Sequence, residues 1–249
     1  MRIFLLVLLF FSGLHAEPHP LLDYFHVVTV ATRHHPNIDK LIQSCQMHGM
    51  ELEILGMGNE YPGNGAKFIY MRDYIQNLKD YEIVMFVDAF DVLIVADKEV
   101  ILDKFLQMEQ PFVMSVEKNC YPCDRYEGFY PPSPTHFKYL NTGSYIGYVA
   151  HLKRWFKALE PIIPHVCDQA QAVSHYVKNP KLYFFDFQCE LFLPLYNVKP
   201  NEVIINYKDK LVYSIPTRSN PCVIHANGWS FDFWHKVYEQ LVRNETRKN

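Results

Sequence analysis

The first half of the chain alternates short apolar runs with segments in which apolar residues recur at helical spacing. Strands are predicted at residues 26–31, 51–56, 82–87 and 111–116. Helices are predicted between them, near residues 38–45, 68–78 and 100–108. Strands that alternate with helices favour an α/β fold, with a Rossmann-like, mainly parallel sheet flanked by helices.

The second half is less regular. Residues 117–139 form a proline-rich loop in this interpretation, and helices follow near 151–160 and 168–178. Short apolar runs come next, and an amphipathic helix is predicted over 231–243. We expect the first half to form a nucleotide-binding layer and the second half to supply a lid or acceptor region.

The N-terminus has the layout of a secretory signal. Arg2 precedes an apolar stretch at 3–11, and small and polar residues lead to Ala16. We predict a signal peptide at 1–16 and a single domain at 17–249; an uncleaved anchor is the alternative. No other segment approaches the ~20 apolar residues of a membrane span. The expected location is the lumen of the endoplasmic reticulum or Golgi, the outside of the cell, or an extracytoplasmic space in a bacterium.

Charge and cysteine content bear on the binding partners and on the compartment of the protein. A net charge of -3 gives no general electrostatic reason for nucleic-acid binding. The six cysteines fit a compartment in which disulfides persist. Cys120 and Cys123 favour a local disulfide, with a redox pair as the alternative; a zinc site would need a second close pair of ligands.

Asp88 and Asp91 follow the apolar run 82–87, where open parallel sheets bind ligands. On a continuous strand, residues three apart point to opposite sides, so the two carboxylates converge only if the chain turns after Asp88. Paired carboxylates repel, and Mg²⁺ or Mn²⁺ would relieve that repulsion. The alternative is a pair of turn aspartates that accept backbone N–H groups.

His225 ends another apolar run and is followed by Ala-Asn-Gly. Imidazole is an acceptable Mn²⁺ ligand beside two carboxylates. With 12 histidines in the chain, an ordinary structural role is the alternative for this one.

Seven short motifs occur in one order between residue 26 and about residue 230: VTVAT, GNGAK, MFVDAFDVLI, YLNTGSYIGY, DQ, FDFQCELF and IHANG. Together they resemble the glycosyltransferase domain of the procollagen lysyl hydroxylases that also glycosylate collagen. The chain looks more distantly like the procollagen galactosyltransferases.

This resemblance implies a GT-A type glycosyltransferase fold, a UDP-sugar donor and Mn²⁺. It makes Asp88, Asp91 and His225 the metal ligands. A metal there would neutralise the charge that develops as UDP leaves. The positions that it assigns to donor binding are Thr29, Thr32, Lys67, Phe90, Asn141, Gly143, Asn227 and Gly228. Asn141 and Gly143 would lie on a loop lining the donor site.

Asp168 matches an acidic residue that the family uses close to the transferred sugar, and we predict it to be catalytic. It could instead cap the helix that follows. Cys167 stands where relatives have a second aspartate, which bears on sugar preference and on activity. Trp229 follows the last motif, where it would stack on a sugar or pack in the core.

The leading hypothesis is a glycosyltransferase that moves glucose or galactose from UDP to a protein or glycan acceptor. Hydroxylysine or galactosyl-hydroxylysine in a collagen-like chain is the acceptor that the family implies. A sugar-nucleotide or glycan-binding pseudoenzyme is the alternative that Cys167 supports. A metal-dependent phosphohydrolase is less favoured, because its aspartates are usually two apart.

Overall fold

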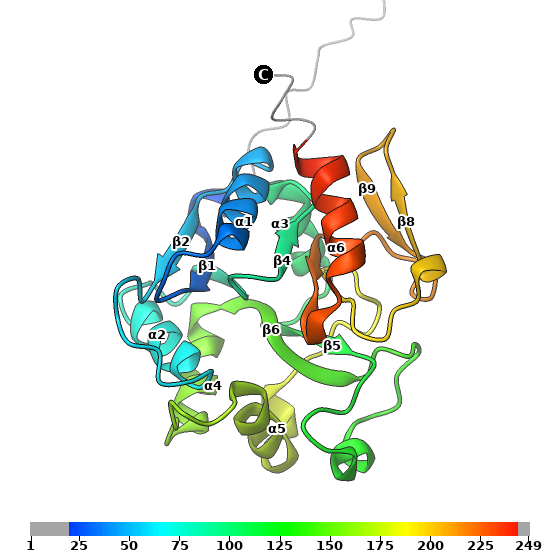
Figure 1. The fold of residues 1–249 in the computed structure, drawn as a ribbon. Coiled ribbons are helices and arrows are strands. Elements are labelled where there is room, and N and C mark those ends of the chain that lie inside the picture. The colour runs from blue at the N-terminus through cyan, green and yellow to red at the C-terminus, as the bar shows by residue number, and fades with distance from the viewer. Residues whose placement is uncertain (1–19, 244–249) are drawn as a thin grey trace, which may run out of the picture.

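The computed structural model describes residues 20–243, so the predicted signal peptide at 1–16 lies outside the described residues (Figure 1). A five-stranded sheet has the strand order β2-β1-β3-β6-β5. Its strands are β1 (Phe25–Val30), β2 (Leu52–Leu55), β3 (Ile83–Val87), β5 (Phe112–Glu117) and β6 (Tyr139–Tyr148).

Strands β2, β1 and β3 run parallel, whereas β6 is antiparallel to both β3 and β5. The predicted α/β class is confirmed, with a parallel-containing sheet that is mixed because of β6. The sequence interpretation placed Asn141 and Gly143 on a loop, and that prediction is wrong. Both residues lie inside β6, whose side chains are almost all buried.

Alternate residues of the central strands explain why helices cover both faces of the sheet. Val28 and Phe86 pack on one side with α2 (Ala66–Ile75), α4 (Val149–Leu159) and α5 (Asp168–Lys178). Val27 and Met85 pack on the other side with α1 (Pro36–Met47) and α3 (Lys98–Gln107). Strands buried on both faces need continuous apolar runs, as the sequence has at 83–87.

A second sheet of three strands has the order β4-β10-β7 and lies beside the first. Its strands are β4 (Val92–Ile94), β7 (Phe192–Pro194) and β10 (Val223–His225). Its own core includes Trp234 of α6 (Phe231–Val237), which continues into a π-helical turn, Tyr238–Arg243. A hairpin of β8 (Val203–Asn206) and β9 (Leu211–Ser214) lies near α6 in Figure 1.

All six cysteines are free, which corrects the expected disulfides. The thiol of buried Cys120 lies 3.5 Å from the carbonyl oxygen of Cys123, while the Cys123 side chain is exposed, so the predicted local bridge is not formed. Within residues 20–243, no helix has the length and apolar character needed to cross a membrane.

Candidate active site where the two sheets meet

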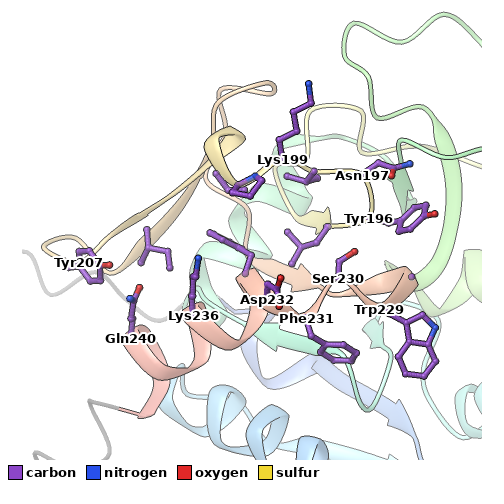
Figure 2. Close-up of a pocket in the computed structure, with 17 residues that line it drawn as sticks. Tyr196, Asn197, Lys199, Tyr207, Trp229, Ser230, Phe231, Asp232, Lys236 and Gln240 are labelled. Atoms are coloured by element: carbon purple, nitrogen blue, oxygen red, sulfur yellow. The ribbon is translucent and has the colours of Figure 1, made fainter.

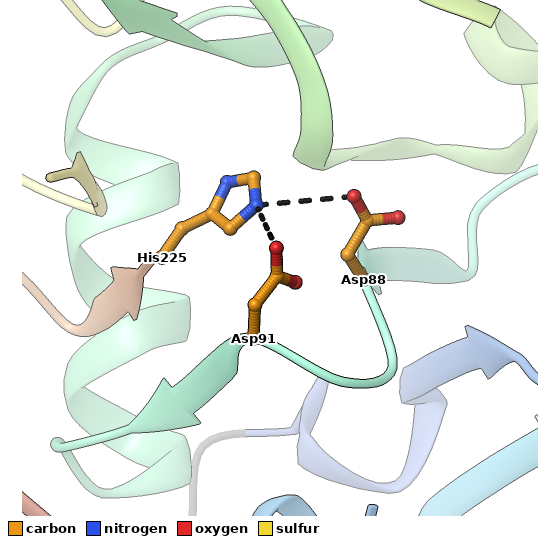
Figure 3. Close-up of side chains that lie close together, drawn as sticks. All are labelled: Asp88, Asp91 and His225. Atoms are coloured by element: carbon orange, nitrogen blue, oxygen red, sulfur yellow. Dashed lines mark ion pairs between the residues drawn. The ribbon is translucent and has the colours of Figure 1, made fainter. Parts of the chain in front are cut away.

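Residues 88–91 carry the chain from the main sheet to the second sheet. The Asp88 N–H donates to the Gly143 carbonyl of β6 at 2.8 Å, and the Ala226 N–H donates to the Asp91 carbonyl at 2.7 Å. His225 is the register partner of Val92 in the β10–β4 pair. The turn that the aspartates needed in order to converge is therefore present, and the strand pairing brings His225 beside them (Figure 3).

The three predicted metal ligands lie together. His225 Nε2 is 3.3 Å from Asp91 Oδ2 and 3.8 Å from Asp88 Oδ2, and one ligand atom from each residue lies within 4.8 Å of the others. The other ring nitrogen, His225 Nδ1, is buried and has no hydrogen-bond partner among the described residues. Two carboxylate oxygens and one imidazole nitrogen form a donor set that suits a divalent cation such as Mn²⁺.

The electrostatics of the triad favour added positive charge. Burial raises the pKa of Asp88 to about 6, although Lys67 opposes this rise. Burial also disfavours the charged form of Asp91, but His225 holds its pKa below the ordinary value. For His225, burial lowers the pKa, but Asp91 more than offsets this and the pKa is raised. A cation between these groups would relieve the repulsion that burial intensifies.

Lys67 and Asp168 adjoin the triad. Lys67 Nζ lies 2.7 Å from Asp88 Oδ1 and 2.8 Å from Asp168 Oδ2, so it bridges the two carboxylates. Burial acts to lower the pKa of Lys67, but Asp168 and Asp88 raise it well above its ordinary value. Asp168 also accepts from the Thr142 hydroxyl at 3.0 Å. It is the first residue of α5, and the helix has no side-chain cap, so the capping alternative is not what the structure shows.

Two adjoining cavities share these side chains. The cavity of about 790 Å³, hereafter the donor cavity, has Thr32, Lys67, Phe90, both triad aspartates and Gly228 in its wall. The cavity of about 520 Å³, hereafter the catalytic cavity, is bounded by the whole triad and by Lys67, Asn141, Gly143, Asp168, Asn227 and Gly228. Eleven of the twelve predicted site residues thus border one cavity or both.

The sequence matches a family model described as the PLOD GT domain over residues 22–233. The chain belongs to this family. It is 28% identical over 225 residues to a procollagen-lysine,2-oxoglutarate 5-dioxygenase of Drosophila melanogaster, covering 84% of this chain and 31% of that protein. It is also 28% identical over 222 residues to a multifunctional procollagen lysine hydroxylase and glycosyltransferase of Caenorhabditis elegans, covering 81% and 30%.

The chain therefore spans about a third of the length of those two relatives. Among solved structures, one of a glycosyltransferase involved in glycosylation of the PBCV-1 major capsid is 13% identical, with a TM-score of 0.46. The match covers 82% of this chain and 94% of that chain.

Thr29 is the predicted residue of the PLOD GT domain that borders neither cavity. It is fully buried in β1, and its hydroxyl donates to the Val87 carbonyl of β3 at 2.7 Å. Phe90 borders the donor cavity and is half-buried, with its ring 5.1 Å from that of His35. Thr29 thus braces the strand that leads to Asp88, whereas Phe90 lies where a flat ring could stack.

Glu117 is the functional candidate that the sequence reasoning missed. Its carboxylate is buried and accepts the amides of Asn141 and Gln169 at 2.9 Å and of Asn227 at 3.0 Å. Burial raises its pKa although these three bonds oppose the rise. Through these three hydrogen bonds, Glu117 of β5 connects its strand to β6, to α5 and to the turn after His225. The available signal in the sequence was an acidic residue directly after the apolar run 111–116.

Proposed function

We propose that this protein is a metal-dependent glycosyltransferase that moves glucose or galactose from a UDP-sugar to a hydroxyl of an acceptor. In this reaction the bond from the sugar C1 to the diphosphate oxygen breaks, the bond from C1 to the acceptor oxygen forms, and UDP and a proton are released. The observation that supports this most is the Asp88–Asp91–His225 triad, which borders two adjoining cavities beside the Lys67–Asp168 pair.

The proposed roles follow from the contacts. Asp88, Asp91 and His225 would hold Mn²⁺, which when bound stabilises negative charge on the diphosphate. Lys67 presents a persistent cation to the donor cavity, because both neighbouring carboxylates favour its charged form. Thr142 and Lys67 fix the Asp168 carboxylate. We assign to Asp168 the place close to the transferred sugar that the family resemblance implies. Preorganised charges of this kind need little rearrangement during the reaction.

The acceptor and the location are proposals drawn from the relatives and the N-terminus. The printed names of two relatives refer to procollagen lysine, so hydroxylysine or galactosyl-hydroxylysine of a collagen-like chain is one proposed acceptor. With the apolar sequence at 3–11, we place the protein in the secretory lumen or outside the cell, as a single domain over 17–249. Nucleic acid is not among its proposed partners.

The test is a panel of UDP-sugars with Mn²⁺ or with a chelator, with and without collagen-type acceptors, monitored as UDP release. We expect Mn²⁺-dependent release from UDP-glucose or UDP-galactose. Asp91→Asn should lower it by about 100-fold or more, because the metal loses a charged ligand. Asp103→Asn, at an exposed position of α3, is the matched control and should leave release unchanged.

The panel also separates the alternatives. Equal UDP release by the Asp91 variant and the unaltered protein would overturn the metal assignment. Binding of UDP without release from any UDP-sugar would instead identify a sugar-nucleotide-binding pseudoenzyme, the reading that Cys167 at the N-cap of α5 leaves open.

A further inference from the structure

A groove of about 700 Å³ lies between α6, the loop that follows β7, and β8. Hereafter it is the α6 groove. In Figure 2, Tyr207 and Gln240 lie at one end of it, and Tyr196 and Trp229 lie at the other. Its volume is in the range of sites that enclose a whole ligand, roughly 300–1,000 Å³.

The Trp229 end of the groove opens onto the candidate active site. Gly228 and Trp229 border the groove and both cavities described above. Tyr196 is shared with the catalytic cavity, and Phe231 with the donor cavity. A molecule in the groove would therefore have one end beside the metal triad, which is where a second substrate must present its reacting atom.

Trp229 is held outward by its backbone. Its side chain is 89% exposed, so the alternative that it packs in the core is wrong. Its φ is +67°, a conformation that bulky non-glycine residues rarely adopt. Gly228 before it has φ +59°, and a Cβ there would lie 2.4 Å from the Tyr196 ring. The turn thus supports an exposed indole at the mouth of the site.

A second aromatic platform stands at the far end of the groove, where Tyr207 is 63% exposed. Between the platforms lie the polar side chains of Asp232 and Lys236, and Asn197 lies beside Tyr196 at the Trp229 end. Near Tyr207, the buried Oε1 of Gln240 has no hydrogen-bond partner within residues 20–243.

Charge in the α6 groove is low, with Lys199 and Lys236 against Asp232. Flat aromatic faces, an amide side chain near each of them and few charges suit a neutral ligand that carries many hydroxyls and has apolar ring faces. A polyanion would need a denser cluster of cations.

We propose that the α6 groove binds the acceptor as a saccharide of at least two sugar rings, one stacked on Trp229 and another on Tyr207. This inference rests on the proposed function. A hydroxyl of the ring at Trp229 would attack the donor sugar C1, the bond from C1 to the diphosphate oxygen would break, and UDP and the hydroxyl proton would be released. The enzyme would then extend an existing glycan of two or more rings, in place of the hydroxylysine or galactosyl-hydroxylysine acceptor that the relatives' names suggest.

The test measures binding of the full chain to an array of di- to pentasaccharides, to the corresponding monosaccharides, and to a sugar-free collagen-type peptide. We expect one oligosaccharide or more to bind about tenfold more tightly than its terminal monosaccharide. Tyr207→Ala should weaken that binding about tenfold. Tyr81→Ala removes an exposed tyrosine outside the groove and should leave it unchanged.

UDP binding and UDP release are measured in parallel, so that the two proposals fail separately. If the protein binds and turns over a UDP-sugar but prefers no oligosaccharide, the proposed function stands and the proposal that the α6 groove binds a saccharide is overturned. Equal saccharide binding by Tyr207→Ala would also overturn it, as would Tyr207-dependent binding of the sugar-free peptide. Saccharide binding without any UDP binding would support the groove and contradict the transferase.

Discussion

At the scale of single residues, Gly143 decides whether Asp88, Asp91 and His225 can come together. A Cβ at this position would lie 2.1 Å from His225 Cε1 and 2.9 Å from Asp88 Oδ2. The backbone of Gly143 also accepts the Asp88 N–H, so β6 cannot easily move away. The absence of a side chain, rather than an unusual backbone conformation, is what the site requires here.

We therefore predict that Gly143→Ala displaces His225 and lowers Mn²⁺-dependent UDP release by about 100-fold. It should also destabilise the fold by about 1–3 kcal/mol through overpacking. Gly128→Ala is the control, because a Cβ at residue 128 meets nothing within 4 Å. Steady-state kinetics and urea unfolding check both effects. Normal turnover by Gly143→Ala would show that the triad geometry is not needed.

Residue types and motif order predicted much of the candidate site, but not its internal supports. Asp88, Asp91 and His225 come together as expected. Glu117 was not predicted because its three hydrogen-bond donors are amides from distant parts of the sequence. Thr29 has the residue type of a ligand contact, yet strand pairing turns its hydroxyl to Val87. Which partner such a side chain meets depends on the register of the neighbouring strands.

At the scale of elements, Asp186 fixes the approach to β7. Its buried carboxylate accepts the backbone N–H groups of Glu190, Leu191 and Phe192 at 2.8–2.9 Å. Burial raises its pKa to about 6 although these bonds oppose the rise. The native state thus holds this proton more tightly than the unfolded chain, in which an aspartate titrates near 4. This contribution to the unfolding free energy therefore falls as pH rises from about 4 to about 6.

The prediction is a pH-dependent difference between the unaltered protein and Asp186→Asn. From pH 5 to pH 8, the unfolding free energy of the unaltered protein should fall by about 1 kcal/mol relative to the variant. Urea unfolding at several pH values measures this difference. Parallel curves for the unaltered protein and Asp186→Asn would mean that this carboxylate titrates normally.

Most elements of the first half follow from periodicity, and the exceptions have a physical cause. The predicted strand at 82–87 corresponds to β3 and the predicted helix near 38–45 to α1. Strand β6 was missed because its sequence carries an asparagine and two glycines, residues that disfavour strands. Antiparallel pairing on both edges overrides that preference. The short strand β4 was hidden in the apolar stretch after Asp91.

At the scale of the whole molecule, the candidate metal site joins two sheets. Asp88 follows β3 of the main sheet, Asp91 precedes β4, and His225 ends β10 of the second sheet. Periodicity along the chain does not show that β10 pairs with both β4 and β7, because these strands come from distant segments. The ligands can therefore meet only after both sheets have formed.

A cation bound by this triad should stabilise the folded chain, because the unfolded chain does not assemble the ligands. With Mn²⁺ at about 100 times its dissociation constant, the expected gain is about 2.7 kcal/mol, or an increase of roughly 5–10 °C in Tm. Scanning calorimetry with Mn²⁺ and then with a chelator measures it. His225→Asn should abolish the increase, whereas His136→Asn, at an exposed position, should keep it. An equal increase in Tm for His225→Asn and the unaltered protein would place the bound cation elsewhere.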